Sequence, residues 1–527
     1  MLTRITGAKC IGIDAVPVTV EVDINAGIGI HLVGLADVAV KESLLRIMTA
    51  LQSAGFRIPG RKVVINLAPA DMHKRGSGYD LPIALGILAA SGQAELPALG
   101  RYLIMGELGL DGSIRRVSGA LPMAELAESL GLDGCLLPEE SAAEASECTG
   151  LRIYAVRTLP EVLRILSGRV PADIRPVSAP EPSPEEDPDA GRMDFSEIIG
   201  QETAKRGLEI AAAGGHNVMM VGPPGSGKSS LAKALPDILP PISREEAVLA
   251  SKIYSVAGMG GRNGLLRRRS FRAPHYSASL AAIIGGGAGE NILPGEISLA
   301  THGVLFLDEF TLMPKAVTEA LRAPLEDRKI TVSRLRAKIE YPASFMLVAA
   351  ANPCPCGYFG EGDRCTCTPG QRQGHLLRLS GPMLDRIDIQ LFLKSVDAAR
   401  LVGRAGAEPP RESSATVARR VRAARAIQQE RLREDGIRCN AEMNARQMNR
   451  HCPLSAECRT VLENLIDRTG LSARAFGRVV RLARTIADLE AAAALQAGGP
   501  LSAGPIRPEH LLEAAGYRML DRRDWGP

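Results

Sequence analysis

The sequence predicts a multidomain chain of three parts: an α+β domain, an α/β core around a phosphate-binding loop, and an all-α region. Three observations lead to this prediction. Strand-like and helical apolar patterns alternate over residues 1–170, a glycine-rich motif follows an apolar run in mid-chain, and the apolar patterns after residue 404 have helical spacing. A length of 527 residues suits three domains of ordinary size.

Composition limits the classes of protein that fit. Although 45% of the residues are hydrophobic, no window approaches the roughly 18 uninterrupted apolar residues of a membrane span, and the first residues lack the pattern of a signal peptide. A cytoplasmic protein with no membrane partner is therefore expected, whose ten cysteines are thiols or metal ligands rather than disulfides. Because the net charge is only +4, any binding of nucleic acid must come from local basic patches.

The domain boundaries follow from changes in composition and pattern. In residues 1–170, the runs "PVTVEVDI", "KVVINLAP" and "RYLIMGELGL" predict strands, and runs over 37–55, 81–92 and 120–131 predict helices. Residues 171–193 are rich in proline, serine and acids, which predicts a flexible linker. The α/β core is expected over 194–404 and the helical region over 405–527, after the turn-rich stretch "GRAGAEPPRESS".

The stretch "VGPPGSGKSS" contains a complete G-x-x-x-x-G-K-[ST] motif between a predicted strand, "HNVMMV", and a predicted helix, "LAKAL". The glycines let consecutive backbone N–H groups converge on phosphate oxygens, Lys228 neutralises the β- and γ-phosphates, and Ser229 ligates Mg²⁺. ATP and Mg²⁺ are therefore the predicted cofactors. The predicted nucleotide-binding residues are Gly222, Pro223, Pro224, Gly225, Ser226, Gly227, Lys228, Ser229 and Ser230.

Two further apolar runs end in polar residues that suit ATP hydrolysis. "GVLFLDE" ends in Asp308, which suits the Mg²⁺ shell, and Glu309, which suits orientation and deprotonation of an attacking water. "SFMLVAAANP" ends at Asn352, whose amide suits positioning of water or sensing of the γ-phosphate, with a plain turn residue as the alternative. Arg386, in "LSGPMLDRIDI", suits an arginine finger that reaches the ATP of a neighbouring subunit.

These residues lie in segments that carry a family resemblance. "DFSEIIGQ", "GPPGSGKS", "PGEISLATHGVLFLDE", "AAANPCPCGYFG" and "LSGPMLDRIDI" resemble magnesium-chelatase-like AAA+ ATPases, and more closely the ComM/YifB family of competence proteins. "HLVGLADVAVKES" and "SGYDLPIALGILAASGQ" resemble the N-terminal half of that family. The resemblance implies an AAA+ core, a helical lid and a homo-oligomeric ring, expected to be a hexamer. It also implies that Arg474 is the lid arginine called sensor 2, with Arg478 as the competing choice.

The first domain resembles the proteolytic domain of Lon proteases, a ribosomal S5 domain 2-like fold. At the positions that match the Lon serine and lysine, this chain has Asp80 and a residue close to Leu121, so the Ser–Lys dyad is missing. A dyad shifted to Ser77 and Lys74 is the alternative. The domain is interpreted as a scaffold or a collar that guides DNA.

Two basic stretches bear on the substrate. "RKITVSRLRAKIEYPASF" predicts a β-hairpin with Arg334, Arg336 and Lys338 near its tip, and it resembles the presensor hairpin that related ring helicases insert into a central channel. These side chains are predicted to contact the DNA backbone, with an exposed solubilising hairpin as the alternative. For the second stretch the alternatives are contact with DNA, contact with an adjacent subunit, or exposure to solvent. It contains Arg267, Arg268, Arg269, Arg272 and His275.

A cysteine cluster follows directly after Asn352. Its pattern is C-x-C, eight residues, C-x-C, formed by Cys354, Cys356, Cys365 and Cys367. Four thiolates are able to surround one Zn²⁺ tetrahedrally, so the pattern predicts a structural zinc site, with free thiols as the alternative.

Together, the motifs and the resemblance imply an ATP-dependent DNA helicase or translocase. It would act without sequence preference on single-stranded or branched DNA and promote branch migration in natural transformation. An aromatic content of 3% favours contact with the DNA backbone over stacking on bases. The alternative is an ATPase that remodels proteins or drives a metal-chelatase partner.

Overall fold

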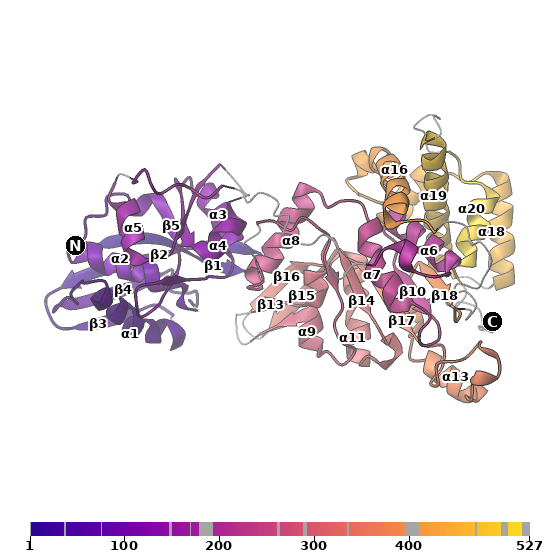
Figure 1. The fold of residues 1–527 in the computed structure, drawn as a ribbon, viewed down its shortest axis with the longest axis horizontal. Coiled ribbons are helices and arrows are strands. Elements are labelled where there is room, and N and C mark those ends of the chain that lie inside the picture. Colours follow the sequence, from indigo (N-terminus) through magenta and orange to yellow (C-terminus); the bar gives the residue numbers. More distant parts are fainter. Residues whose placement is uncertain are drawn as a thin grey trace.

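The computed structural model describes residues 2–35, 38–74, 76–146, 150–168, 170–178, 193–260, 264–287, 292–334, 337–396, 411–469, 472–496 and 504–518. Figure 1 shows an N-terminal α/β domain at one end of the long axis, a second α/β part in the middle and a group of helices at the other end. The middle part is built on a parallel sheet. The predicted multidomain architecture with a helical C-terminal region is thereby confirmed.

The N-terminal domain surrounds a seven-stranded sheet of order β3-β4-β2-β1-β5-β8-β9. Alternate residues of the central strand β2, such as Val18, Val20 and Val22, are buried, as expected where one face of a sheet packs on helices. The strands are β1 (Thr3–Ile11), β2 (Asp14–Asn25), β3 (Gly29–Val33), β4 (Lys62–Ala68), β5 (Tyr102–Ile104), β8 (Gly134–Pro138) and β9 (Arg152–Val156), with a small separate hairpin of β6 (Glu107–Leu108) and β7 (Ile114–Arg115).

Helices complete the core of this domain, and α2 and α3 pack directly against β2. The three predicted helices and two of the three predicted strands are present, whereas the run over 101–110 forms two short strands, β5 and β6, that belong to different sheets. The helices are α1 (Val38–Ser53), α2 (Asp80–Ala90), α3 (Ala120–Ser129), α4 (Glu139–Ala145) and α5 (Leu159–Leu166).

The segment expected to be a linker, residues 171–193, begins by packing on the N-terminal domain. Ile174 and Val177 are partly buried against its core, and the Val177 N–H donates to the carbonyl of Ile153 at 2.7 Å. Residues 179–192, which hold most of the proline-rich and acidic sequence, lie outside the described residues.

The middle part contains five parallel strands in the order β11-β14-β17-β10-β18. Successive residues of β10 face opposite cores: Val218 and Met220 pack with the C-terminal helices, whereas Met219 and Val221 pack in a separate cluster. A parallel sheet covered on both faces explains why its strands appear in the sequence as continuous apolar runs. The strands are β10 (Val218–Val221), β11 (Phe271–Arg272), β14 (Val304–Leu307), β17 (Met346–Ala351) and β18 (Ile389–Phe392).

The connections of the middle part hold short helices and two small hairpins. The helices are α6 (Glu202–Gly214), α7 (Lys228–Ile238), α8 (Arg244–Val256), α9 (Leu280–Ile284), α10 (Glu296–Leu299), α11 (Lys315–Ala320), α12 (Arg322–Asp327), α13 (Pro369–Leu376) and α14 (Gly381–Leu384). One hairpin pairs β12 (Gly285–Gly286) with β13 (Leu293–Pro294).

The second hairpin confirms the pairing predicted from the sequence. Strands β15 (Lys329–Arg334) and β16 (Ala337–Pro342) are antiparallel, and Arg334 pairs with Ala337 at the end of the ladder. One face of the hairpin is apolar and buried, while the polar side chains alternate outward. The buried residues are Ile330, Val332, Ile339 and Tyr341, and the exposed residues are Thr331, Ser333, Lys338 and Glu340.

The C-terminal helices pack on the sheet through α16, which contacts α6 and α7, and α19, which contacts α6. Asp488 of α19 is fully buried, and its carboxylate is paired with Arg431 at 2.7 Å and Arg484 at 3.1 Å. A buried carboxylate requires such partners because it has lost its hydration. The helices are α16 (Ser414–Leu432), α17 (Ala445–His451), α18 (Ala456–Thr469), α19 (Ala473–Gln496) and α20 (Pro508–Gly516).

The N-terminal domain meets the middle part along α8, which lies between them in Figure 1. Lys252 of α8 forms ion pairs with Asp14 at 2.8 Å and Glu125 at 2.7 Å, and the Ser255 hydroxyl donates to buried Glu144 at 2.8 Å. The two parts therefore share a polar contact, in which Ser255 and Glu144 are buried and Asp14 is exposed. Among the described residues, no helix is both long and apolar enough to cross a membrane.

Candidate active site

The phosphate loop joins the end of β10 to the start of α7. Gly225 and Gly227 have positive φ angles of 77° and 90°, which glycine adopts without strain. A Cβ atom on Gly222 would lie 2.8 Å from Leu393 Cβ, so the close approach of the residue directly after β18 also requires glycine. The loop thus delivers its backbone N–H groups to the N-terminus of α7, a favourable place for phosphate. All nine predicted nucleotide-binding residues lie in this loop or in the first turn of α7.

Ser229 and Asp308 meet as predicted. The Ser229 hydroxyl donates to one carboxylate oxygen of Asp308 at 3.1 Å, and the other oxygen accepts the Glu309 N–H at 2.8 Å. Asp308 is brought there because β14 and β10 both pair with β17, so their carboxyl ends lie at one edge of the sheet. Two hard oxygen donors at this separation fit Mg²⁺.

Lys228 and Asn352 also meet. The Lys228 ammonium donates to the carbonyls of Gly222 and Pro223 at 2.7 and 2.9 Å, and to the Asn352 amide oxygen at 3.3 Å. Burial lowers the pKa of Lys228, an effect that the nearby Asp308 carboxylate opposes. The end of β17 is therefore coupled directly to the phosphate loop.

Glu309 follows β14 in the left-handed conformation, with φ 49° and ψ 41°. For a residue other than glycine this backbone costs energy and is common where a side chain is held for function. Glu309 lines a cavity of about 450 Å³ together with Asn352, His375 and Arg378. The arrangement places a carboxylate and an amide on the wall of one cavity, and Asn352 also contacts Lys228 of the phosphate loop.

Gln201 supports the phosphate loop, a role that was not predicted from the sequence. Gln201 donates from its side-chain amide to the carbonyls of Ser226 and Lys394, at 3.1 and 2.7 Å, and so ties the phosphate loop to the segment after β18. Its own φ of 62° is in the left-handed region. The only local signal is a polar residue directly before α6, which by itself does not distinguish a support from an ordinary helix end.

Arg386 lies away from this group of residues. Its guanidinium pairs with Glu326 at 2.7 Å and donates to the carbonyls of Arg322 and Pro382 at 3.1 and 2.6 Å, and the side chain is buried. These contacts hold it to α12 and α14. Within a single chain, the predicted finger arginine is thus part of a structural contact.

Arg474 and Arg478 line a separate cavity of about 720 Å³ between the middle part and the C-terminal helices. Arg478 pairs with buried Asp388 at 2.5 Å, and this charge contributes to a pKa of Asp388 well below its usual range despite burial. Arg474 is exposed. Of the described residues that line this cavity, none belongs to the phosphate loop.

Two residues of the second basic stretch form ion pairs within the chain. Arg269 pairs with Glu246 at 2.8 Å, and Arg272 with Glu296 at 2.6 Å. Arg267, Arg268 and His275 are exposed. Of the hairpin-tip residues, Lys338 is exposed, whereas Arg336 and the Arg334 side chain lie outside the described residues.

In the N-terminal domain, Asp80 and Leu121 are both fully buried. Asp80 pairs with Arg46 at 3.0 Å, and burial raises its pKa to about 6. The alternative residues also bond elsewhere: Lys74 donates to the Pro69 carbonyl and Ser77 donates to Glu107. None of these hydrogen bonds joins Ser77 to Lys74.

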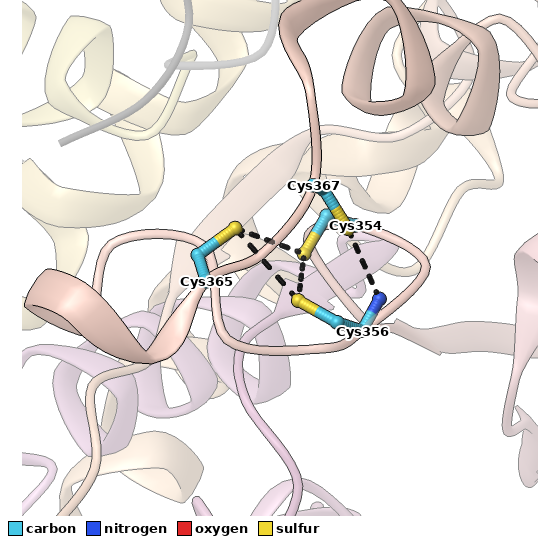
Figure 2. Close-up of side chains that lie close together, drawn as sticks. All are labelled: Cys354, Cys356, Cys365 and Cys367. Carbon is cyan, nitrogen blue, oxygen red and sulfur yellow. Dashed lines mark hydrogen bonds between the residues drawn. The ribbon is translucent and has the colours of Figure 1, made fainter.

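The four clustered cysteines converge in space, as Figure 2 shows. The Cys354 sulfur lies 3.3 Å from that of Cys356 and 3.8 Å from that of Cys365, and the latter two sulfurs are 3.7 Å apart. The Cys367 sulfur accepts the Cys356 N–H at 3.4 Å. All four sulfurs lie within 4.8 Å of one another. The predicted set of metal ligands is therefore brought together.

Comparison with known proteins places all three parts of the chain in one family. The family described as magnesium chelatase, subunit ChlI, matches residues 194–401, its C-terminal family matches 411–518, and the family described as subunit ChlI of Mg-chelatase matches 20–141.

Similar proteins extend the match to nearly the full length. Uncharacterized protein YifB of Salmonella typhimurium is 41% identical over 97% of this chain and 96% of its own length. Competence protein ComM of Haemophilus influenzae is 39% identical over the same shares. The magnesium-chelatase 38 kDa subunit of Rhodobacter capsulatus is 29% identical over 30% of this chain and 50% of its own length. The chain therefore belongs to the ComM/YifB family of magnesium-chelatase-like AAA+ proteins.

Proposed function

We propose that this protein is an ATP-hydrolysing ring motor on DNA, a helicase or translocase that promotes branch migration when incoming DNA recombines in natural transformation. The observation that carries the motor activity is the meeting of Lys228 with Asn352, and of Ser229 with Asp308, beside Glu309. The name of the Haemophilus influenzae relative, competence protein ComM, supports the link to transformation.

The residues of the site have distinct tasks in this proposal. The loop N–H groups and Lys228 hold the β- and γ-phosphates of ATP, and Ser229 and Asp308 hold Mg²⁺, which neutralises phosphate charge when bound. Glu309 orients a water in the adjoining cavity and accepts its proton. Asn352 responds to the γ-phosphate, and its contact with Lys228 supports that coupling.

We infer that hydrolysis requires a ring, expected to be a hexamer. The contacts of Arg386 are to Glu326 and to backbone carbonyls of its own chain, and Arg474 lines a cavity away from its own phosphate loop. Because, among the described residues, neither arginine has a contact with the phosphate loop of its own chain, we assign both to the ATP of a neighbouring subunit, where an arginine stabilises the charge of the transition state; to act there, Arg386 has to exchange its pairing with Glu326 for the nucleotide. Arg474 is preferred to Arg478 as the lid arginine because Arg478 is occupied by Asp388.

DNA contact is assigned to the tip of the β15–β16 hairpin, with Arg334, Arg336 and Lys338 tracking the phosphate backbone without sequence preference. The apolar face of the hairpin is anchored in the core and Lys338 on its other face is exposed, which supports this assignment. The N-terminal domain is interpreted as a Lon-protease-like (ribosomal S5 domain 2-like) scaffold or DNA-guiding collar without peptidase activity. The proposed setting is the cytoplasm, with ATP, Mg²⁺ and structural Zn²⁺ as cofactors.

A second candidate is a motor that remodels proteins or drives a metal-chelatase partner. The matches to magnesium chelatase subunit ChlI favour this second candidate. The same hydrolytic site serves either kind of motor. The substrate, rather than the ATPase chemistry, distinguishes the two candidates.

ATP turnover by the full chain, measured with single-stranded DNA, with an unfolded protein and with neither, separates these candidates. We expect DNA to stimulate turnover, the stimulation to fall steeply with salt, and the change Arg334→Ala/Arg336→Ala to reduce it. The control variant Lys315→Ala, which removes an exposed positive charge on α11, should keep the stimulation. Stimulation by unfolded protein and not by DNA would favour the second candidate.

A further inference from the structure

The geometry of the four clustered thiols matches a single tetrahedral ion. When four sulfurs bind one Zn²⁺ at about 2.3 Å, the edges of the tetrahedron are about 3.8 Å. Three sulfur–sulfur distances are 3.3, 3.7 and 3.8 Å, and the fourth sulfur completes a set contained within 4.8 Å. The sulfurs belong to Cys354, Cys356, Cys365 and Cys367.

The same geometry excludes two other uses of these thiols. A disulfide requires sulfurs about 2.05 Å apart, and the four cysteines are free thiols at much longer separations. In an iron–sulfur cluster with several irons, the cysteine thiolates bind different iron ions. Such a cluster is incompatible with four sulfurs in one compact tetrahedron. Four thiolates around one ion form a closed site, typical of structural zinc.

The loop that carries the thiols has little apolar core of its own. Between β17 and α13, its buried residues are Pro353, Cys354 and Gly357, and the remaining residues are partly or fully exposed. Arg364 stacks over the Tyr358 ring at 4.5 Å, which is a weak surface contact. A segment of this kind needs a cross-link to hold one conformation, and a metal ion provides one.

This loop is also a wall of the hydrolytic cavity. Cys354 lines the cavity of about 450 Å³ that contains Glu309 and Asn352. His375 of α13, which lines the same cavity, donates to the Asn352 carbonyl at 3.0 Å. A Cβ on Gly357 would lie 2.9 Å from Pro224 Cδ, so the loop also packs against the phosphate loop.

We propose that Cys354, Cys356, Cys365 and Cys367 bind one Zn²⁺ that fixes this loop and thereby positions Asn352 and α13 around the hydrolytic cavity. The ion is structural and does not contact ATP. Its effect on hydrolysis is transmitted through Asn352, two residues before the first ligand, and through the His375 contact. The four cysteines are positioning residues for the ATPase site.

The metal itself is tested on the purified full chain by elemental analysis, after purification without chelator. We expect one zinc per chain, its loss in Cys367→Ser, and its retention in Cys367→His, because imidazole is also a zinc ligand. Cys10→Ser, at a thiol outside the cluster, should keep one zinc. Cobalt in place of zinc should give the absorption of a tetrahedral thiolate site. A chain without zinc that also fails to take up added Zn²⁺ or Co²⁺ overturns the proposal, as does a Cys367→Ser variant that keeps the metal.

The positioning role is tested by ATP turnover, and this half of the proposal rests on the proposed ATPase. We expect the kcat of Cys367→Ser to fall by about tenfold to 100-fold, because a misplaced catalytic group costs about that much. KM should change less. Cys367→His should restore kcat. Amide exchange of α13 should rise in Cys367→Ser and return to the wild-type rate in Cys367→His. Loss of zinc with kcat and α13 exchange unchanged would refute the positioning role. An inactive wild-type chain that still binds one zinc would count against the proposed function and leave the metal site supported.

Discussion

In the proposed mechanism, Glu309 is the residue on which hydrolysis depends most directly. Its left-handed backbone turns the side chain out of β14 toward the cavity that it shares with Asn352. Because a general base contributes about 10²- to 10⁴-fold, Glu309→Gln should lower ATP turnover by that factor while ATP binding persists. Turnover and binding of a fluorescent ATP analogue check this prediction. Glu463→Gln, at an exposed glutamate on α18, should change neither, and full turnover in Glu309→Gln would contradict the assignment.

Asp80 predicts a pH dependence in the N-terminal domain. Burial raises the pKa of its carboxyl to about 6, from about 3.9 in the unfolded chain. The folded state therefore holds the proton more tightly, and the stabilisation present below pH 4 is lost as pH rises through 6. Asp80→Asn lacks this titration, so its stability relative to wild type should rise between pH 4 and 7 by about 2 kcal/mol.

Calorimetric melting across that pH range measures the effect. Asp71→Asn, at an exposed carboxylate of the same domain, is the matched control. An Asp80→Asn difference that does not change with pH would show that the Asp80 carboxyl does not titrate in this window.

At the scale of elements, the phosphate loop depends on its contact with the segment after β18. An alanine at Gly222 would place Cβ 2.8 Å from Leu393 Cβ and 2.9 Å from the Leu393 carbonyl. Since overpacking costs about 1–3 kcal/mol, Gly222→Ala should weaken ATP binding by about tenfold to 100-fold. Gly370→Ala, where a Cβ meets open space, is the matched control. Equal affinities in a direct binding titration would contradict the close approach.

Most elements of this fold are predictable from the sequence because their signals are local. The continuous apolar runs before Gly222, Asp308 and Asn352 indicate buried parallel strands, and the alternation over 329–342 indicates the hairpin. The meeting of Ser229 with Asp308 follows once these strands share a sheet edge.

The partners of the arginines were not predictable from the sequence. Arg269 and Arg272 belong to a basic run that suggests a binding surface, but their carboxylate partners Glu246 and Glu296 lie more than 20 residues away in sequence. Arg386 likewise pairs with Glu326, on a different helix. Local spacing does not encode such long-range pairs, which form only when the chain has folded.

At the scale of the whole molecule, α8 links the N-terminal domain to the ATPase core. Lys252, with a side chain only 12% exposed, sits between Asp14 and Glu125. Lys252→Glu places three like charges together, which costs several kcal/mol at an interface. We expect amide exchange of α3 and α8 to rise about tenfold or more in the full chain. Lys315→Glu, at an exposed lysine on α11, should leave both helices protected, and protection retained in Lys252→Glu would show that this ion pair does not hold the domains together.

The central claim is that the ATPase site drives movement on DNA. ATP-dependent branch migration of a labelled three-way DNA junction tests it most directly, with the full chain compared with Glu309→Gln and with Arg334→Ala/Arg336→Ala. We predict strand release by the wild type, its loss in Glu309→Gln, and a marked decrease in the hairpin variant. ATP hydrolysis without strand release, and without stimulation of ATP turnover by the junction, would contradict the claim. It would indicate that this motor acts on a protein partner.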